Sequence, residues 1–324
     1  MMRTGYLPVK RRVQRGVLAG VAVSAALTLA ACGSSSSTSA SGGGSSSNPL
    51  APTASNGTVV IGSANFPENE LLAEIYSQAL QGAGVKVTDK FNIGAREVYY
   101  PEVQKGAITV IPEYNGALLT TSVDTTSHAA TTAQVNAALM AKLPASLEIL
   151  NSSTAQDKDS VTVTQAFATA HHLTSIAQLG PVAKTMVIGG PPEFKTRANG
   201  LVGLKNNYGL TFKSFSPLDE SGPISLAALV DGKVQAADIF TTTPQIITDH
   251  LVALADPKFN FAAQNVTPLV YKKGVSSTTV NTLNEISAKL TTAALLAMDK
   301  AVVIDHAQYL AVADGWLKAV GMKS

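Results

Sequence analysis

The sequence predicts an α/β protein with two related lobes, and three observations indicate this fold class. From Gly57 onward, short β-rich runs alternate with segments whose apolar residues recur at helical spacing. The run Val-Ile-Gly at residues 60–62 returns at residues 187–189. Further residues match in register after each copy, which favours a duplicated unit over a chance repeat.

The first unit shows the pattern most clearly. Residues 58–62 are an apolar run that ends in glycine, which is typical of a buried strand. A helix is expected from Pro67, because proline suits a first helical turn and Glu68 and Glu70 are favourable near a helix N-terminus. The helical pattern ends at Gly82, and residues 85–87 begin another strand.

The second unit repeats these landmarks at nearly the same spacing. Forty-four residues after Gly62 stands Gly106, and the corresponding glycine of the second unit is Gly232; each follows a helical pattern. Eight residues beyond these glycines stand Tyr114 and Phe240, each at the end of an expected strand. Since strand ends of open α/β sheets bind ligands, we expect a binding cleft between the lobes there.

The end of the chain has a different pattern. Helical spacing recurs at residues 280–290, 292–303 and 306–320, with no β-rich run between them. We expect these three helices to pack back on the first lobe.

The first 56 residues are expected to precede the folded body. Basic residues lead into a fifteen-residue apolar run at residues 17–31, which is typical of an export signal and short for a membrane-spanning helix. The run ends in Leu29-Ala30-Ala31-Cys32, which resembles the lipobox of bacterial lipoproteins. We therefore expect a signal peptide at 1–31, lipidation of Cys32 and a Gly/Ser/Pro tether at 32–56. This predicts a lipid-anchored protein on the extracytoplasmic face of the cell membrane.

Charge and motif content argue against several functions. The chain has 24 Lys and Arg and 22 Asp and Glu, but five basic residues lie in the first fifteen positions. The remaining chain is slightly acidic, so nucleic acid is not an expected partner. The five histidines show no metal-binding spacing, and no nucleophile motif is present. We expect no enzyme activity and no cofactor.

Several segments resemble the ProX-type osmoprotectant-binding proteins, the receptors of quaternary-amine ABC importers. The segments are IGSANF at 61–66, IPEYNG at 111–116, GGPPEFKTR at 189–197, FTTTP at 240–244 and QNVTPLV at 264–270. The resemblance runs from about residue 58 to residue 317. It implies a type II-like, two-lobed periplasmic-binding-protein fold, with a mixed sheet flanked by helices in each lobe. Lobe I would comprise residues 57–159 plus 265–324, and lobe II residues 160–264, with hinge segments near Ser160 and Gln264.

The resemblance also implies a binding chemistry. A trimethylammonium head lies among aromatic faces, and a basic side chain holds the carboxylate of the ligand. Tyr114 and Phe240 match cage positions, and Arg197 matches the carboxylate-binding arginine, with Glu193 one helical turn before it as an orienting partner. The expected ligand-binding residues are Tyr114, Phe240, Arg197, Glu193, Asn65, Ser160, Thr241 and Gln264.

Four positions depart from the family pattern. Ser160 and Gln264 stand where further tyrosines are usual, and Ala64 and Ala117 replace polar residues that help to hold the carboxylate. Losing two cation–π contacts costs about 1–4 kcal/mol, so we expect glycine betaine to bind no tighter than roughly 0.1–1 mM. A bulkier, more polar or more aromatic ligand is favoured.

The predicted function is therefore that of a monomeric solute receptor of an ABC importer. It captures a quaternary amine, or a diverged analogue, and delivers it to a permease that a cytoplasmic ATPase drives. Two alternatives stay open: a receptor-fold lipoprotein with a sensor or interaction role, and a hydrolase on the same scaffold. The hydrolase needs a base–nucleophile pair in the cleft, and the sequence shows none.

Overall fold

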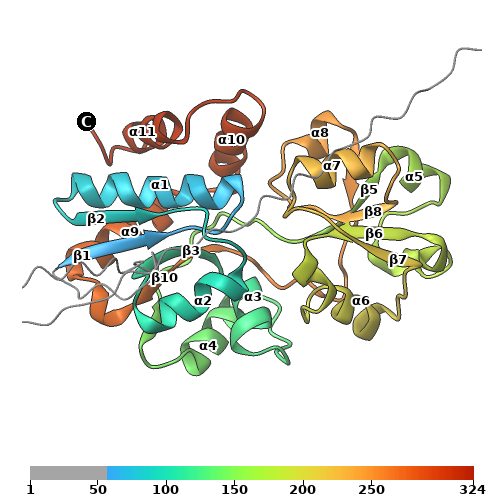
Figure 1. Ribbon diagram of the computed structural model, residues 1–324, viewed down its shortest axis with the longest axis horizontal. Helices are drawn as coiled ribbons and strands as arrows, with labels where there is room; N and C mark the ends of the chain where they lie inside the picture. The colour runs from blue at the N-terminus through green and yellow to red at the C-terminus, as the bar shows by residue number, and fades with distance from the viewer. Residues whose placement is uncertain (1–56) are drawn as a thin grey trace, which may run out of the picture. The chain divides into compact units, whose positions relative to one another are not determined.

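The computed structural model describes residues 57–324, so the predicted signal peptide, Cys32 and the tether lie outside the described residues. The strands of the described part form two five-stranded mixed sheets, each flanked by helices (Figure 1). The predicted α/β fold with two lobes is confirmed. No helix within residues 57–324 combines the length and the apolar character that a membrane span requires.

The first lobe is built on a sheet with the order β2-β1-β3-β10-β4. Its strands are β1 (Thr58–Gly62), β2 (Lys86–Lys90), β3 (Val110–Tyr114), β4 (Leu147–Ile149) and β10 (Val266–Tyr271). Its helices are α1 (Pro67–Gly82), α2 (Arg96–Lys105), α3 (Asn115–Leu118), α4 (Thr132–Lys142), α9 (Ser277–Lys289), α10 (Thr292–Val303) and α11 (Tyr309–Ala319). One π-helical turn, Leu119–Val123, continues α3.

The second lobe has the sheet order β7-β6-β8-β5-β9. Its strands are β5 (Val161–Thr164), β6 (Val187–Gly190), β7 (Ser214–Pro217), β8 (Ala236–Asp238) and β9 (Leu251–Ala253). Its helices are α5 (Gln165–Ala170), α6 (Leu201–Tyr208), α7 (Pro223–Val230) and α8 (Gln245–Thr248).

The two sheets share one topology. In the first, β1 pairs in parallel with β2 and β3, and the antiparallel strand β10 follows β3. In the second, β6 pairs in parallel with β7 and β8, and the antiparallel strand β5 follows β8. In each sheet the antiparallel strand is the one that comes directly after a crossing from the other lobe. This equivalence supports the duplication inferred from the repeated sequence landmarks.

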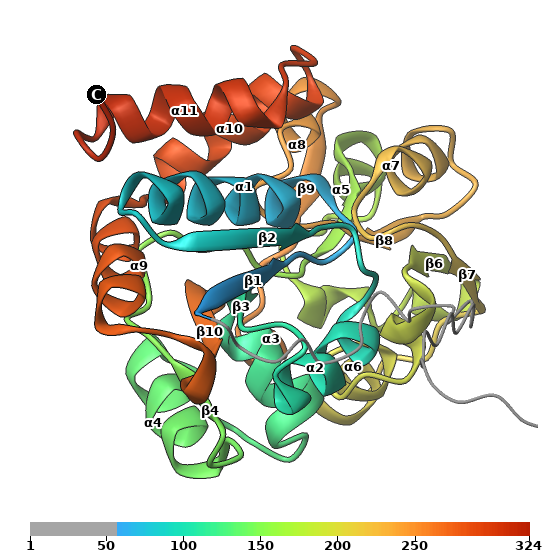
Figure 2. The same ribbon diagram turned by 60° about the vertical axis from the view of Figure 1, so that its left-hand side comes forward.

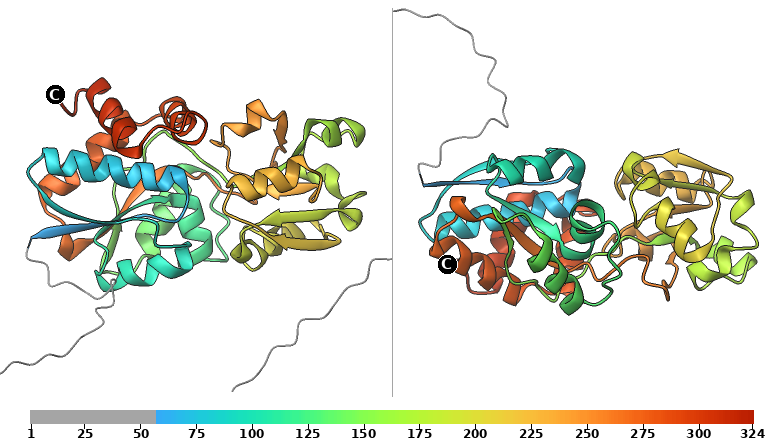
Figure 3. Two further views of the ribbon diagram at one scale, coloured as in Figure 1. Left: turned by 45° about the horizontal axis from the view of Figure 1, so that its top comes forward. Right: turned by 90° about the horizontal axis from the view of Figure 1, so that it is seen from below.

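Two chain segments connect the lobes, one between β4 and β5 and the other between β9 and β10 (Figure 3). Ser160 lies at the end of the first segment and Gln264 near the end of the second. Helices α9, α10 and α11 contact α1 and cover the first lobe, as the sequence predicted (Figure 2).

Helix α1 shows how local sequence positions the site. Pro67 occupies the first turn, and Leu72, Ile75 and Tyr76 are fully buried against the sheet. Burial of such large side chains contributes roughly 1.5–3 kcal/mol each, which fixes the helix on the sheet. The N-cap residue Phe66 is extended and buried, so its ring lies at the edge where β1 gives way to α1. The start of α1 therefore presents the ring of its N-cap residue Phe66 and the carboxyl group of Glu68 to the second lobe.

Candidate functional site

The site lies where strand ends of the two lobes meet. We use the name inner site for the small hollow that residues of both lobes and of both crossing segments form. It is lined by Phe66, Arg96, Tyr114, Ala117, Asp157, Asp159, Arg197, Glu220, Phe240 and Gln264. Its free volume is about 20 Å³, on the order of one water molecule. The lobes therefore have to separate before an organic ligand can enter.

Three aromatic rings form one wall of the inner site. Tyr114 ends β3, Phe66 precedes α1, and Phe240 follows β8 of the second lobe. The ring centre of Phe66 lies 5.9 Å from that of Tyr114 and 5.2 Å from that of Phe240, the latter in an edge-on arrangement. Phe240 packs against the core of the first lobe although it belongs to the second. These rings can contact one ligand from both lobes.

Glu68 forms hydrogen bonds with residues of both lobes next to these rings. Its two carboxylate oxygens accept hydrogen bonds of 2.6 Å from the Tyr114 hydroxyl of its own lobe and from the Thr242 hydroxyl of the second lobe. Burial raises the pKa of Glu68 well above its usual range, and the nearby charge of Asp299 raises it further. A carboxyl group in this position favours any cation that can approach it.

Three acidic side chains line the inner site itself. Asp157 accepts hydrogen bonds from the backbone N–H of Thr242, at 3.1 Å, and from the Thr241 hydroxyl. Asp159 accepts from the Gln264 amide at 2.6 Å. Burial, followed by the charge of Glu68, raises the pKa of Asp157. The third acid is Glu220, for which burial raises the pKa to about 7.

The two arginines of the inner site are already occupied by glutamates. Arg96 donates two hydrogen bonds of 2.8 Å to Glu113, which is fully buried in β3. Arg197 donates to both oxygens of Glu97, at 3.0 and 2.9 Å, across the lobe boundary. Arg197 also lies 3.7 Å from Glu193 and 3.8 Å from Glu220, so carboxylates of the protein itself hold both guanidinium groups. Asp157 and Asp159 have no ion-pair partner within residues 57–324, so acidic side chains outnumber free basic ones in the inner site.

Residues 57–319 match the family described as the substrate binding domain of ABC-type glycine betaine transport systems. The chain belongs to this family. It is a solute-binding receptor of an ABC importer, as the sequence predicted.

Solved structures of low sequence identity share the fold of this receptor. A glycine betaine/carnitine/choline ABC transporter protein is 18% identical, with a TM-score of 0.62, over 82% of this chain and 99% of that one. Apo YehZ from Escherichia coli is 23% identical, with a TM-score of 0.57, over 82% of this chain and 99% of that one. A choline binding protein of an ABC transporter, in complex with choline, is 14% identical, with a TM-score of 0.60, over 81% and 88% of the respective chains.

Four of the eight ligand-binding residues predicted for the receptor line the inner site: Tyr114, Phe240, Arg197 and Gln264. The structure gives two of them partners that the sequence did not suggest. The guanidinium of Arg197 faces Glu97, rather than an open position for a ligand carboxylate. The amide of Gln264 binds Asp159 through both its nitrogen and its oxygen.

The other four predicted residues lie outside the lining of the inner site. Asn65 is exposed, and the hydroxyl of Thr241, also exposed, accepts a hydrogen bond from the Lys158 backbone. Ser160 is buried and donates to the Ile239 carbonyl at 2.6 Å, which ties β5 to the segment after β8. Glu193 lies 3.7 Å from Arg197, consistent with its predicted orienting role.

The sequence reasoning missed Phe66, Arg96, Asp157, Asp159 and Glu220, which also line the inner site. Phe66 carried a usable signal, because it stands between a predicted strand and the proline that begins a helix. The acidic residues carried none, since they lie in crossing segments or loops without a periodic pattern.

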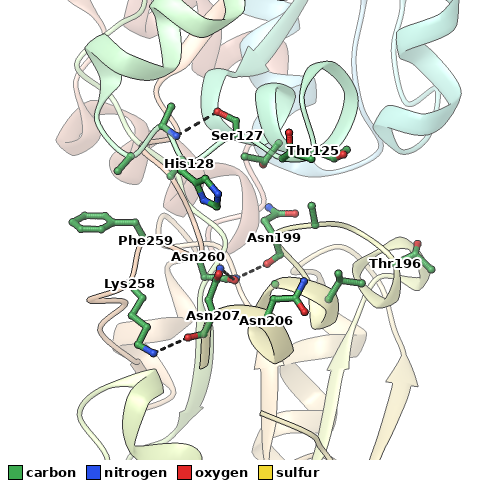
Figure 4. A pocket seen from close by; sticks show the side chains of 18 residues that line it. Thr125, Ser127, His128, Thr196, Asn199, Asn206, Asn207, Lys258, Phe259 and Asn260 are labelled. Carbon is green, nitrogen blue, oxygen red and sulfur yellow. Dashed lines mark hydrogen bonds between the residues drawn. The ribbon is translucent and has the colours of Figure 1, made fainter. Parts of the chain in front are cut away.

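A wider hollow of about 640 Å³ shares no lining residue with the inner site (Figure 4). Amide and hydroxyl side chains dominate it, including Asn199, Asn206, Asn207 and Asn260. Figure 4 shows the Lys258 ammonium bound to the Asn207 carbonyl. No carboxylate lines this hollow, so its chemistry differs from that of the acidic, aromatic inner site.

Proposed function

We propose that this receptor captures a small quaternary-amine cation, with choline as the simplest example, between its two lobes. One observation carries the proposal: the inner site combines three aromatic rings from both lobes with acidic side chains in excess over free basic ones. A quaternary ammonium has no N–H donor, so aromatic faces and diffuse negative charge are the groups that recognise it. Solved relatives include a choline binding protein in complex with choline, which supports this ligand class.

The saturated arginines favour a ligand without a carboxylate. A betaine brings an anionic group that needs a free basic partner in a buried site. Arg96 is held by Glu113 and Arg197 by Glu97, so a betaine must displace a glutamate or leave its carboxylate beside Asp157 and Asp159. Choline carries a hydroxyl in place of that carboxylate and avoids this cost.

Capture requires that the ligand favour the closed arrangement of the lobes. A ligand that touches Tyr114 of the first lobe and Phe240 of the second shifts the equilibrium toward closure by its differential affinity. In this proposal the closed receptor docks on a membrane permease, and a cytoplasmic ATPase drives uptake. The lipobox at residues 29–32 supports a lipid anchor on the extracytoplasmic face.

Calorimetry with choline and its neutral isostere 3,3-dimethylbutan-1-ol tests the ligand class. The two molecules have the same shape, and only choline carries the charge. Choline is expected to bind about 5- to 1000-fold more tightly, because two contacts of about 0.5–2 kcal/mol each are lost with the charge. Equal affinity for both molecules would contradict a cation site.

A further inference from the structure

A second hollow adjoins the inner site and has no role in binding a compact ligand such as choline. We call it the side chamber; its volume is about 350 Å³. It shares Phe66, Glu220 and Phe240 with the inner site, so the two hollows lie on either side of these residues. Its other apolar walls come from α7 and from α10 of the C-terminal helices, and include Pro223, Leu226, Val302 and Val303. These walls suit an aliphatic chain.

Acidic groups stand within these apolar walls. Glu68 and Asp299 line the side chamber and are 5% and 4% exposed, and Glu220 lines it from the side of the inner site. Oδ2 of Asp299 is buried and has no hydrogen-bond donor among residues 57–324. Oε1 of Gln245, on the same lining, is in the same situation within the described chain. A buried acceptor without a donor costs roughly 1–3 kcal/mol, so a ligand with N–H donors is favoured beside Gln245, and at Asp299 it replaces the proton that the carboxyl pair binds in the free receptor.

A primary ammonium group matches this arrangement. It carries three N–H donors, a positive charge and no acceptor, whereas a quaternary ammonium carries no donor. The inner site offers aromatic faces for a quaternary head, and the side chamber offers acceptors and carboxylates for a donating end. The apolar surface between them suits methylene groups.

We propose that the side chamber is a second subsite of the receptor, which binds the primary ammonium end of an elongated dication whose quaternary head lies in the inner site. This inference rests on the proposed function, because it takes the inner site as the place of the quaternary head. The preferred ligand class is then a trimethylammonium alkylamine with a short aliphatic spacer. Asp299 and Glu68 bind its ammonium group, and Phe66 and Phe240 contact its spacer.

In the absence of ligand, a proton binds to the carboxyl pair of Glu68 and Asp299. Burial raises the pKa of Asp299 to about 7, and burial with the charge of Asp299 keeps the pKa of Glu68 well above its usual range. An ammonium group that binds between these carboxyls lowers both pKa values and displaces the proton. The titratable groups that face the pair are Tyr114, Asp157, Glu220, His306 and Tyr309. Binding of the dication therefore releases protons near pH 7.

Matched probe pairs test the subsite. Each pair compares an aminoalkyl-trimethylammonium with the alkyltrimethylammonium of the same spacer, at three, four and five methylene groups. For the best-fitting spacer, the amino probe is expected to bind the full chain at least about tenfold more tightly, as a charge-assisted hydrogen bond requires. Calorimetry at pH 7 in phosphate and in MOPS, two buffers without a primary amine, is expected to show greater proton release for the amino probe than for the alkyl probe.

The variant Asp299→Asn removes the charge at nearly constant shape. It is expected to abolish the tenfold preference of the amino probe over the alkyl probe, and circular dichroism verifies that the variant is folded. Asp314→Asn on α11 is the control, because Asp314 pairs with Lys318 and Lys323 and does not line the side chamber. Equal binding of amino and alkyl probes at every spacer, or a preference that persists in Asp299→Asn, overturns the subsite and leaves the cation receptor intact. Failure of choline and of all probes to bind overturns the cation receptor, and the subsite with it.

Discussion

Glu97 of helix α2 and Arg197 of the second lobe form a two-point contact across the lobe boundary. The Nε and Nη2 atoms of Arg197 lie 3.0 and 2.9 Å from the two carboxylate oxygens of Glu97. Arg197 is buried, whereas the side chain of Glu97 is 48% exposed, so the glutamate is the partner that can leave. The contact closes the lobes and occupies the arginine that family resemblance assigns to a ligand carboxylate.

Replacing Glu97 with glutamine is expected to change ligand preference. The variant Glu97→Gln removes the carboxylate that holds Nε and Nη2 of Arg197 and leaves only the longer contacts with Glu193 and Glu220, so glycine betaine gains a partner for its carboxylate and binds about tenfold more tightly. Choline, which has no carboxylate, is expected to bind as before. Calorimetry measures both affinities, with Glu102→Gln as the control on the same helix, since Glu102 pairs with the exposed Lys105 and does not line the inner site. An unchanged affinity for glycine betaine would show that Arg197 does not limit carboxylate binding.

Phe66 is expected to contribute to binding as much as Phe240 does. Each ring offers one cation–π contact, so Phe66→Ala and Phe240→Ala each reduce choline affinity about 2- to 30-fold. Phe259→Ala is the matched control, because Phe259 is 60% exposed and lines the amide-rich hollow instead. Circular dichroism verifies folding before titration. If Phe259→Ala weakens binding as strongly as Phe66→Ala, the cation does not lie against the aromatic wall.

The stability of the unliganded receptor is expected to fall as pH rises. Burial raises the pKa of Glu220 and of Asp299 to about 7 in the folded chain, from 4.5 and 3.8. Because the folded state binds these protons more tightly, their contribution to stability is complete below about pH 4 and is lost as pH rises through 7. Urea unfolding at pH 5 and pH 8 measures the difference.

Glu220→Gln is the variant that tests this pH dependence. It is expected to reduce the difference in unfolding free energy between pH 5 and pH 8, because the glutamine stays neutral at both. Added choline is expected to stabilise the wild-type protein more at pH 8, where the acids of the site are ionised. If the unfolding free energy changes between pH 5 and pH 8 by the same amount in Glu220→Gln and in the wild type, Glu220 does not cause the pH dependence.

The predicted lipid anchor at Cys32 can be tested by a single substitution. Cys32→Ala removes the only thiol of the chain, so the variant is expected to leave the membrane fraction or to accumulate as an unprocessed precursor. Membrane fractionation and gel mobility measure the outcome. A variant that fractionates and migrates like the wild type would show that Cys32 is not the anchor.

Local sequence patterns were sufficient for the α/β class and the two related lobes, whereas the discontinuous first lobe was implied only by the family resemblance. The alternation of strands and helices, the glycine stops and the repeated Val-Ile-Gly run predicted two related lobes, and Tyr114 and Phe240 were placed at strand ends that meet in the inner site. Helix α1 began at Pro67, as the position of proline indicated. These features depend on short-range periodicity, which a single sequence displays.

The electrostatics of the site depend on contacts between distant parts of the chain. Glu68 and Asp299 influence each other although 231 positions separate them. Glu97 and Arg197, in different lobes, are one hundred positions apart. Neither pair leaves a spacing or motif in the sequence, because an acid on a helix is as often solvated as paired. The occupied arginine and the excess of carboxylates became visible only with the tertiary structure.

The direct comparison of choline with glycine betaine on the unmodified receptor tests the central claim that the cleft takes a cation without a carboxylate. The two ligands share the trimethylammonium head and differ at the other end, where the protein presents Asp157, Asp159 and Glu220 rather than a free arginine. By calorimetry at pH 7.5, choline is expected to bind at least about tenfold more tightly than glycine betaine. A low-micromolar dissociation constant for glycine betaine, with choline weaker, would contradict the account.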